Sequence, residues 1–147
     1  MKVFIATDGS DVSIEAARQG VQLFPGAQLT LVTARADEFV PGEMAGGFAG
    51  PLMSPEEADE FNTEATITAE GELARTADAI AGTHTDQLVI EGEAGPAICQ
   101  AAQDHGVDVI VVGSHGKGAL KRTFLGSVSH HILQHAPCPV LVVRHQK

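Results

Sequence analysis

Glycines and small hydroxyl residues near the carboxyl end of the chain are spaced so that they could bind phosphate. Gly113 and Gly116 follow an apolar run at residues 109–112, and Gly126 with Ser127 then opens a segment of helical character. Glycine at the end of a strand lets the backbone approach a ligand closely, because no side chain intervenes. The first amides of a helix lack partners and, together with the helix dipole, attract anions. The pattern predicts two half-sites for a polyphosphate.

This glycine-rich segment differs from three common phosphate-binding fingerprints. No stretch of the chain fits the GxxxxGK[ST] pattern of the P-loop. A GxGxxG pattern would begin at Gly116 and Gly118, but Lys121 stands where its third glycine is required. The residues TDGSD at 7–11 also differ from the SGGxDS loop of ATP enzymes that release pyrophosphate. The sequence therefore predicts a nucleotide site of another kind.

Charge is divided unevenly along this acidic chain, whose formal net charge is −10. Residues 1–108 hold all 19 acidic residues and four basic ones, whereas residues 109–147 hold five basic residues, no acid and five of the seven histidines. The imbalance has two interpretations: buried strands that simply lack acids, or a local anion site. Because physiological salt screens charge over about 8 Å, a local basic cluster can attract phosphate in spite of the overall charge.

Composition limits the class of protein. At 147 residues the chain is expected to form one domain, residues 1–147, around a single core. The negative charge and the absence of Trp and Tyr argue against binding to nucleic acid. No apolar run approaches the ~20 residues of a membrane span, and no targeting segment opens the chain. Two cysteines without a CxxC pattern predict neither a disulfide framework nor a zinc ribbon, so we expect a cytoplasmic protein.

Apolar runs and helical periodicities alternate along the chain. Fully apolar strands that alternate with helices predict an α/β fold with a parallel sheet covered on both faces. Ligands of such sheets bind beyond the carboxyl ends of the strands, where Asp8, residues 32–34 and Gly113 are expected. Strands are predicted at residues 3–6, 29–32, 87–90, 107–112 and 140–143, and helices at 14–24, 55–81, 96–105 and 127–135.

One phosphate-binding pattern does fit the chain, namely G-x2-G-x9-G-[ST], formed by Gly113, Gly116, Gly126 and Ser127. With this pattern, and with IATDGSDVSIEAA at 5–17 and APCPVLVVR at 136–144, the chain resembles the ATP-binding universal stress proteins. The resemblance extends over the whole chain except about residues 36–85, where the family is variable. Within that part, residues 36–55 are rich in glycine and proline and predict a long mobile loop.

The resemblance implies a three-layer, Rossmann-like α/β sandwich, similar to the adenine nucleotide alpha hydrolases, with five parallel strands in the order 3-2-1-4-5. It also implies a homodimer, for which pairing through the apolar C-terminal strand would cover a sheet edge. The implied ligand is ATP, and Mg²⁺ would arrive with the nucleotide. The residues that the resemblance assigns to nucleotide binding are Thr7, Asp8, Val32, Gly113, Ser114, His115, Gly116, Gly126, Ser127, Val128 and Ser129.

Each part of the nucleotide has expected neighbours in this set. Asp8 is expected near the nucleoside, and the backbone of Val32 near adenine. Residues 113–116 are expected to surround the ribose and the α-phosphate, and residues 126–129 to donate N–H and O–H bonds to the outer phosphates. Thr7 would add a hydroxyl near the base, at a position where the family often has Val.

Several of these residues also have a purely structural interpretation. Asp8 could cap the turn that follows it, and Ser127 could be only the N-cap of its helix. Lys117, Lys121 and Arg122 lie in the glycine-rich loop, where one of them could reach phosphate or all three could be solvated. The sequence leaves both alternatives open.

Histidines and a Gly-Pro pair are the remaining features near the predicted site. His131 and His135 are four residues apart in a predicted helix, a spacing that can hold a metal, but a packing face is favoured and no third ligand is evident. We therefore predict no metal site. His115 is expected to form hydrogen bonds rather than to catalyse. Gly95 and Pro96 are expected to extend the loop after the third strand and to alter the rim of the site.

No nucleophile–base pair or carboxylate dyad stands out, so no catalytic residue is predicted. We expect a regulatory module of the stress response that binds ATP or another adenine nucleotide and acts through an unidentified protein partner. Two alternatives stay open. One is a slow ATP hydrolase or phosphotransferase, for which Asp8 with Mg²⁺ is the nearest apparatus, and the other is an interaction module that binds no nucleotide.

Overall fold

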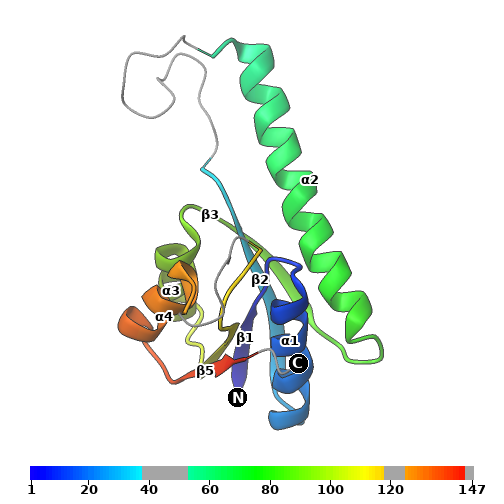
Figure 1. Ribbon diagram of the computed structural model, residues 1–147, viewed down its shortest axis with the longest axis vertical. Coiled ribbons are helices and arrows are strands. Elements are labelled where there is room, and N and C mark those ends of the chain that lie inside the picture. The colour runs from blue at the N-terminus through cyan, green and yellow to red at the C-terminus, as the bar shows by residue number, and fades with distance from the viewer. Residues whose placement is uncertain (38–52, 118–124, 145–147) are drawn as a thin grey trace.

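A five-stranded parallel sheet with two helices on each face forms the structure (Figure 1). The computed structural model describes residues 1–37, 53–117 and 125–144. Most of the predicted loop at 36–55 lies outside the described residues, as do Lys121 and Arg122. In chain order the elements are β1 (Lys2–Ala6), α1 (Asp11–Leu23), β2 (Gln28–Arg35), α2 (Pro55–Ala79), β3 (Asp86–Glu91), α3 (Ala94–Asp104), β4 (Val109–Gly113), α4 (Ser127–His135) and β5 (Val140–Val143).

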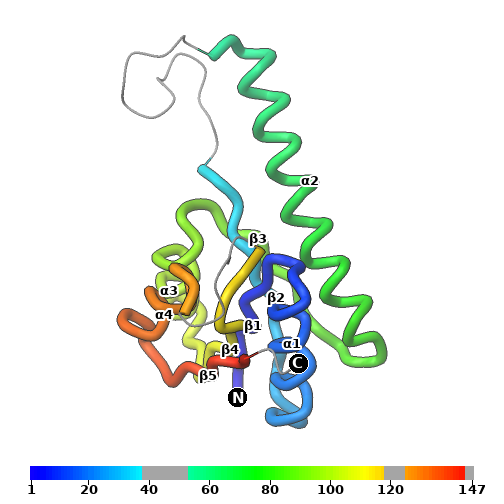
Figure 2. The backbone as a smooth tube through the Cα atoms, in the orientation of Figure 1, coloured from blue at the N-terminus to red at the C-terminus, as the bar shows by residue number. Residues whose placement is uncertain are grey.

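The strands lie in the order β3-β2-β1-β4-β5, and every neighbouring pair is parallel. Figure 2 traces the chain from the central β1 out through β2 to β3, and then back across the sheet to β4 and β5. The direction of winding therefore reverses between β1 and β4. Such a reversal separates the loops at the carboxyl ends of the two strands and leaves a crevice between them. The predicted fold is confirmed.

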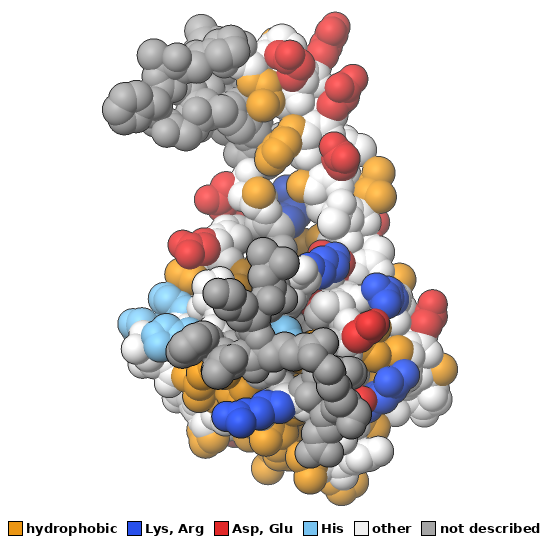
Figure 3. All heavy atoms as spheres, viewed as in Figure 1, with side chains coloured by type: hydrophobic (Ala, Val, Ile, Leu, Met, Phe, Trp, Pro, Cys, Tyr) orange, Lys and Arg blue, Asp and Glu red, His pale blue; other side chains and the backbone are white. Residues whose placement is uncertain are grey.

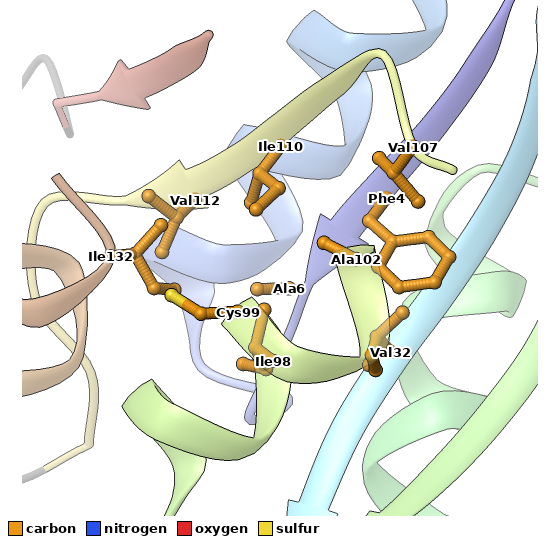
Figure 4. Packing of buried hydrophobic residues seen from close by; sticks show 11 residues of the cluster. Phe4, Ala6, Val32, Ile98, Cys99, Ala102, Val107, Ile110, Val112 and Ile132 are labelled. Carbon is orange, nitrogen blue, oxygen red and sulfur yellow. The ribbon is translucent and has the colours of Figure 1, made fainter. Parts of the chain in front are cut away.

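Apolar side chains on both faces of each strand explain why the sheet needs two helical layers. Along β1, Phe4 and Ala6 pack under α3 and α4, whereas Val3 and Ile5 pack under α1 and α2. Figure 4 shows the first of these two clusters, in which Ile132 of α4 meets side chains of α3 over the strands. The alternation places both faces out of water, as the continuous apolar runs predicted.

Local capping sets where two of the helices begin. Ser10 is the N-cap of α1, and its Oγ accepts a hydrogen bond from the Ser13 amide at 3.3 Å. The helix therefore starts at Asp11, three residues before its first predicted apolar position. Ser54 and Glu57 form a reciprocal capping box at the start of α2, which satisfies two of the free amides of that helix end.

The start of α3 corrects one prediction. Gly95 and Pro96 do not extend the loop after β3, because α3 already begins at Ala94 and both residues lie in its first turn. Proline is tolerated there, since a first-turn amide would have no partner within the helix. A β-carbon on Gly95 would lie 2.8 Å from Cβ of His131, so the missing side chain lets α3 and α4 pack together. Gly95 and Pro96 therefore belong to α3, and Gly95 lies in its contact with α4.

The surface of the molecule is acidic along α2. Figure 3 shows Asp and Glu side chains along the part of α2 that extends beyond the sheet, and histidines gathered over α3 and α4.

None of the helices in the described ranges is long and apolar enough to cross a membrane.

Candidate functional site

A cleft of about 450 Å³ opens at the carboxyl ends of β1, β2 and β4, within the size range of small-molecule sites. It lies where the strand order reverses, as expected for a ligand site of this fold. Nine of the eleven residues predicted to bind nucleotide line it: Thr7, Asp8, Gly113, His115, Gly116, Gly126, Ser127, Val128 and Ser129. Nine residues outside that predicted set also line it: Ala6, Ser13, Thr33, Ala34, Glu72, Ala94, Ile98, Val112 and Lys117.

Val32 does not line the cleft. Its side chain is fully buried in the core, and its carbonyl oxygen accepts a hydrogen bond from the Thr7 amide at 2.9 Å. The backbone group that was expected to meet adenine is therefore used by the sheet. Because side chains of a strand alternate, Ala34 faces the same side two residues closer to the carboxyl end, and Ala34 does line the cleft.

Ser114 is likewise structural. Its amide donates to the Val143 carbonyl at 2.8 Å, and its own carbonyl accepts from the Gly126 amide at 2.7 Å and from the Ser129 hydroxyl at 2.9 Å. These bonds join β4, β5 and the start of α4. The Ser129 hydroxyl also lies 3.0 Å from the Gly126 carbonyl, so in this structure its proton is directed at backbone acceptors.

The start of α4 offers backbone amides to the cleft. Gly126 is the N-cap, with extended backbone and no side-chain cap hydrogen bond, and α4 begins at Ser127. Ser127 is thus the first helical residue. The interpretation of Ser127 as the N-cap is wrong, because Gly126 occupies that position. The amides of Ser127, Val128 and Ser129 belong to the first turn, which has no intrahelical acceptors. Together with the positive end of the helix dipole, they form a site suited to an anion.

Asp8 joins the loops that follow β1 and β4. Its Oδ1 accepts from the Ser10 amide at 3.0 Å, and its Oδ2 accepts from the Lys117 amide at 2.9 Å. The hydrogen bond from Ser10 caps the turn after β1, as one of the two interpretations of Asp8 predicted. Asp8 also lines the cleft. Burial raises the pKa of this carboxyl, but the hydrogen bonds from Ser10 and Lys117 outweigh burial and leave the pKa below its ordinary value. Asp8 is therefore a stable anion and a weak base.

Thr7 anchors a buried network of hydroxyls beneath the cleft. Its Oγ1 lies 2.7 Å from Oγ1 of Thr76 and 3.0 Å from Oγ of Ser13, and it accepts from the Gly9 amide at 3.0 Å. Thr76 in turn donates to the Glu72 carbonyl at 2.9 Å. The Thr7 hydroxyl ties the end of β1 to α1 and α2, and Thr7 also lines the cleft.

Glu72 brings α2 into the wall of the cleft. Its Oε2 accepts from the Thr33 hydroxyl at 2.7 Å, and its Oε1 lies 2.8 Å from Nζ of Lys117. The sequence did not single out Glu72, because it is one acid among many in a long acidic helix. Of the three loop cations, Lys117 is the one within the described ranges, and it pairs with a carboxylate of the protein.

The histidines are explained by packing and local hydrogen bonds. Nδ1 of His115 lies 2.9 Å from Oγ of Ser114, and His115 lines the cleft. The rings of His131 and His135 stack at 4.2 Å. Among the described residues, no group of three His, Cys, Asp or Glu side chains could hold a metal ion.

Comparison with known sequences identifies relatives along the whole chain. Residues 1–144 match the model of the universal stress protein family. The universal stress protein YxiE of Bacillus subtilis is 35% identical over 150 residues, covering 97% of this chain and 98% of the relative. A universal stress protein of Thermus aquaticus is 34% identical over 145 residues, covering 97% of each chain.

Comparison with solved structures finds the same fold. The universal stress protein UspA from Lactobacillus plantarum has a TM-score of 0.79 at 23% identity, covering 98% of this chain and 97% of that one. A family member from Arabidopsis thaliana with AMP bound has a TM-score of 0.64 at 18% identity and covers 99% and 92% of the two chains. One from Archaeoglobus fulgidus in complex with dAMP has a TM-score of 0.60 at 19% identity and covers 97% of each.

Proposed function

Because the chain belongs to the universal stress protein family, we propose that its cleft binds an adenine nucleotide and that ATP is the ligand in the cell. Bound nucleotide would make the protein a regulatory module of the stress response, which acts through a protein partner. The AMP and dAMP complexes of family members with the same fold support the adenine assignment. Any Mg²⁺ would be held mainly by the phosphates, since the described residues offer no cluster of metal ligands.

The uncapped start of α4, facing the cleft, is the observation that carries the proposal. Phosphate oxygens would accept from the amides of residues 127–129, which no side chain caps. The two glycines let the backbone after β4 pack closely, because a β-carbon on Gly113 would lie 3.0 Å from Cγ1 of Val12 and one on Gly116 would overlap the carboxylate of Asp8. The first-turn amides of α4 would thus hold part of the charged end of a nucleotide.

The apolar part of the cleft lining suits a base. Ala34 of β2, Val112 of β4, and Ala94 and Ile98 of α3 provide small and apolar surfaces there. Asp8 also lines the cleft, and the lone pairs that its two recorded bonds leave free could accept O–H bonds from a ribose. An apolar pocket, a carboxylate and an anion site in one cleft are the three groups that a nucleotide requires.

The arrangement favours binding over hydrolysis. A general base is most efficient when its pKa lies near the operating pH, whereas the hydrogen bonds to Asp8 hold its pKa below the ordinary value. We propose no catalytic residue. A hydrolase would require ATP-dependent phosphate release well above a control without protein, and its loss in Asp8→Ala at unchanged ATP affinity.

A second copy of the chain is the proposed partner at the sheet edge. β5 (Val140–Val143) lies at one edge of the sheet, with apolar residues throughout. An apolar edge strand exposes free backbone groups that a two-fold related strand would satisfy. Sedimentation equilibrium of wild type and of Leu141→Lys, expected to shift the protein toward monomer, would test the dimer.

Calorimetry with ATP, ADP and AMP, together with mass spectrometry of nucleotide that copurifies with the protein, tests the function. We expect dissociation constants well below millimolar for wild type and at least tenfold weaker binding for Gly126→Ala. Its β-carbon would lie 3.1 Å from Cα of His115 and disturb the anion site. Gly71→Ala, in open space on α2, is the matched control. Wild-type protein that binds no adenine nucleotide below roughly millimolar, about 4 kcal/mol of binding, would refute the proposal.

A further inference from the structure

Glu72 and Lys117 form an ion pair in the wall of the cleft. The Lys117 ammonium lies 2.8 Å from Oε1 of Glu72, and the side chains are 53% and 15% exposed respectively. Among the residues that the structure describes, Lys117 is the only Lys or Arg that lines the cleft. Within the described ranges, the one lysine or arginine of the cleft lining is therefore already paired with a carboxylate.

The two partners of this ion pair are held to different extents. Glu72 is largely buried, and its second oxygen accepts from the Thr33 hydroxyl at 2.7 Å. The carboxylate is therefore held by its own helix, α2, and by a hydrogen bond from β2. Lys117 is fixed only through its amide, which donates to Asp8, while its side chain is half exposed. A flexible four-carbon stem lets an ammonium move between acceptors while the backbone stays in place. Lys117 is the member of the pair that can change partner.

Both members of the pair line the same cleft as the start of α4, so a phosphate bound there would feel the charge of both. Its negative charge attracts the ammonium of Lys117, but the carboxylate of Glu72 retains that ammonium and repels the phosphate. In this partly buried wall, charges interact more strongly than in bulk water. The net effect on binding depends on the charge of the ligand, because each additional phosphate increases both its attraction to Lys117 and its repulsion by Glu72.

We propose that Glu72 determines how strongly the cleft distinguishes nucleotides by their number of phosphates. The inference rests on the proposed nucleotide function and deepens it. Glu72 competes with the outer phosphates for Lys117 and so lowers the affinity for ATP and ADP relative to AMP. Entry of a polyphosphate exchanges one ion pair for another, and thereby releases the tie between α2 and the loop after β4.

The test is calorimetry of Glu72→Gln with ATP, ADP, AMP and adenosine at low and high salt. Glutamine keeps the size of the side chain and can still accept from Thr33, but it cannot hold the ammonium as an ion pair. We expect ATP affinity to rise about fivefold, AMP affinity to change less than twofold and adenosine affinity not to change. The gain for ATP should shrink at high salt, which screens charge.

Two further variants separate this role from general charge effects. Glu70→Gln removes the same charge from an exposed position on the same helix and should leave the ATP to AMP ratio unchanged. Lys117→Met should weaken ATP binding, and in that background Glu72→Gln should have a smaller effect than in wild type. This dependence identifies the pair itself as the cause.

The outcomes distinguish the inference from the function on which it rests. If wild type binds no adenine nucleotide, the proposed function fails and the inference fails with it. If wild type binds nucleotide but Glu72→Gln leaves the ATP to AMP ratio within twofold, the inference is overturned and the function stands. An equal change in Glu70→Gln also overturns it, since the effect would then be one of overall charge.

Discussion

Gly116 lies so close to Asp8 that a β-carbon at position 116 would be 2.4 Å from Oδ2 of the aspartate. The same oxygen accepts a hydrogen bond from the amide of Lys117, the next residue. The second glycine of the G-x2-G-x9-G-[ST] pattern therefore makes room for a carboxylate from β1, in addition to any room that it leaves for a ligand. Two segments more than one hundred residues apart in the chain meet at this contact.

Gly116→Ala should displace Asp8 and break its bond to the Lys117 amide. We expect at least tenfold weaker binding of adenine nucleotide, measured by calorimetry, because both the loop and the carboxylate would move. Gly71→Ala is the control, since alanine there meets open space and should stabilise α2 by up to about 1 kcal/mol without affecting binding. Wild-type affinity in Gly116→Ala would contradict the prediction.

Thr7→Val should destabilise the fold, although valine has nearly the same shape as threonine. The change leaves the Gly9 amide without its hydroxyl acceptor and removes the partner of Thr76, and an orphaned buried polar group costs about 1–3 kcal/mol. Urea unfolding measures the loss. In the double variant with Thr76→Val, the combined loss should be smaller than the sum of the single losses. Full additivity would show that the two hydroxyls act independently.

The stability of the protein should fall in acid partly because of Asp8. Its pKa is lowered in the folded state, so the unfolded chain takes up the proton first as the pH falls. The stabilisation is present above the ordinary carboxyl pKa of about 3.9 and is lost as the pH falls through the lower folded value. Asp8→Asn should therefore show a shallower fall in unfolding free energy between about pH 5 and pH 2.

Urea unfolding at a series of pH values provides this measurement. Asp78→Asn is the control, because Asp78 is exposed on α2 and its carboxylate has no recorded hydrogen bond among the described residues. This variant should keep the wild-type slope. If Asp8→Asn also keeps it, the hydrogen bonds from Ser10 and Lys117 do not hold the carboxylate in solution.

Gly95→Ala should destabilise the protein even though alanine favours helix. The new β-carbon would lie 2.8 Å from Cβ of His131, closer than side chains tolerate, so α3 and α4 must separate. Overpacking of this kind costs about 1–3 kcal/mol, more than alanine gains in a helix. Thermal unfolding should show a lower midpoint than wild type, and Gly71→Ala an equal or higher one. An unchanged midpoint for Gly95→Ala would mean that the helices adjust freely.

Local sequence patterns were sufficient to predict the fold class and the helices and strands. The apolar runs, for example Val3 to Ala6, and the helical spacing between them determine which segments are buried, because each pattern is written in neighbouring residues. The resemblance supplied the strand order, and the glycine pattern placed the anion site at the start of α4. Nine of the eleven predicted site residues line one cleft for this reason.

Contacts between distant segments decided the rest. Glu72 and Thr33 are 39 residues apart and Glu72 and Lys117 are 45 apart, so no local pattern marks them as neighbours. Strand pairing also determines which residues of β2 lie inside the sheet and which lie at its carboxyl edge. Val32 is buried in the core, whereas Ala34 lines the cleft. By itself the sequence determined which elements form and where an anion could bind. Only the tertiary structure decided which side chains line the cleft, because this depends on how the elements pack.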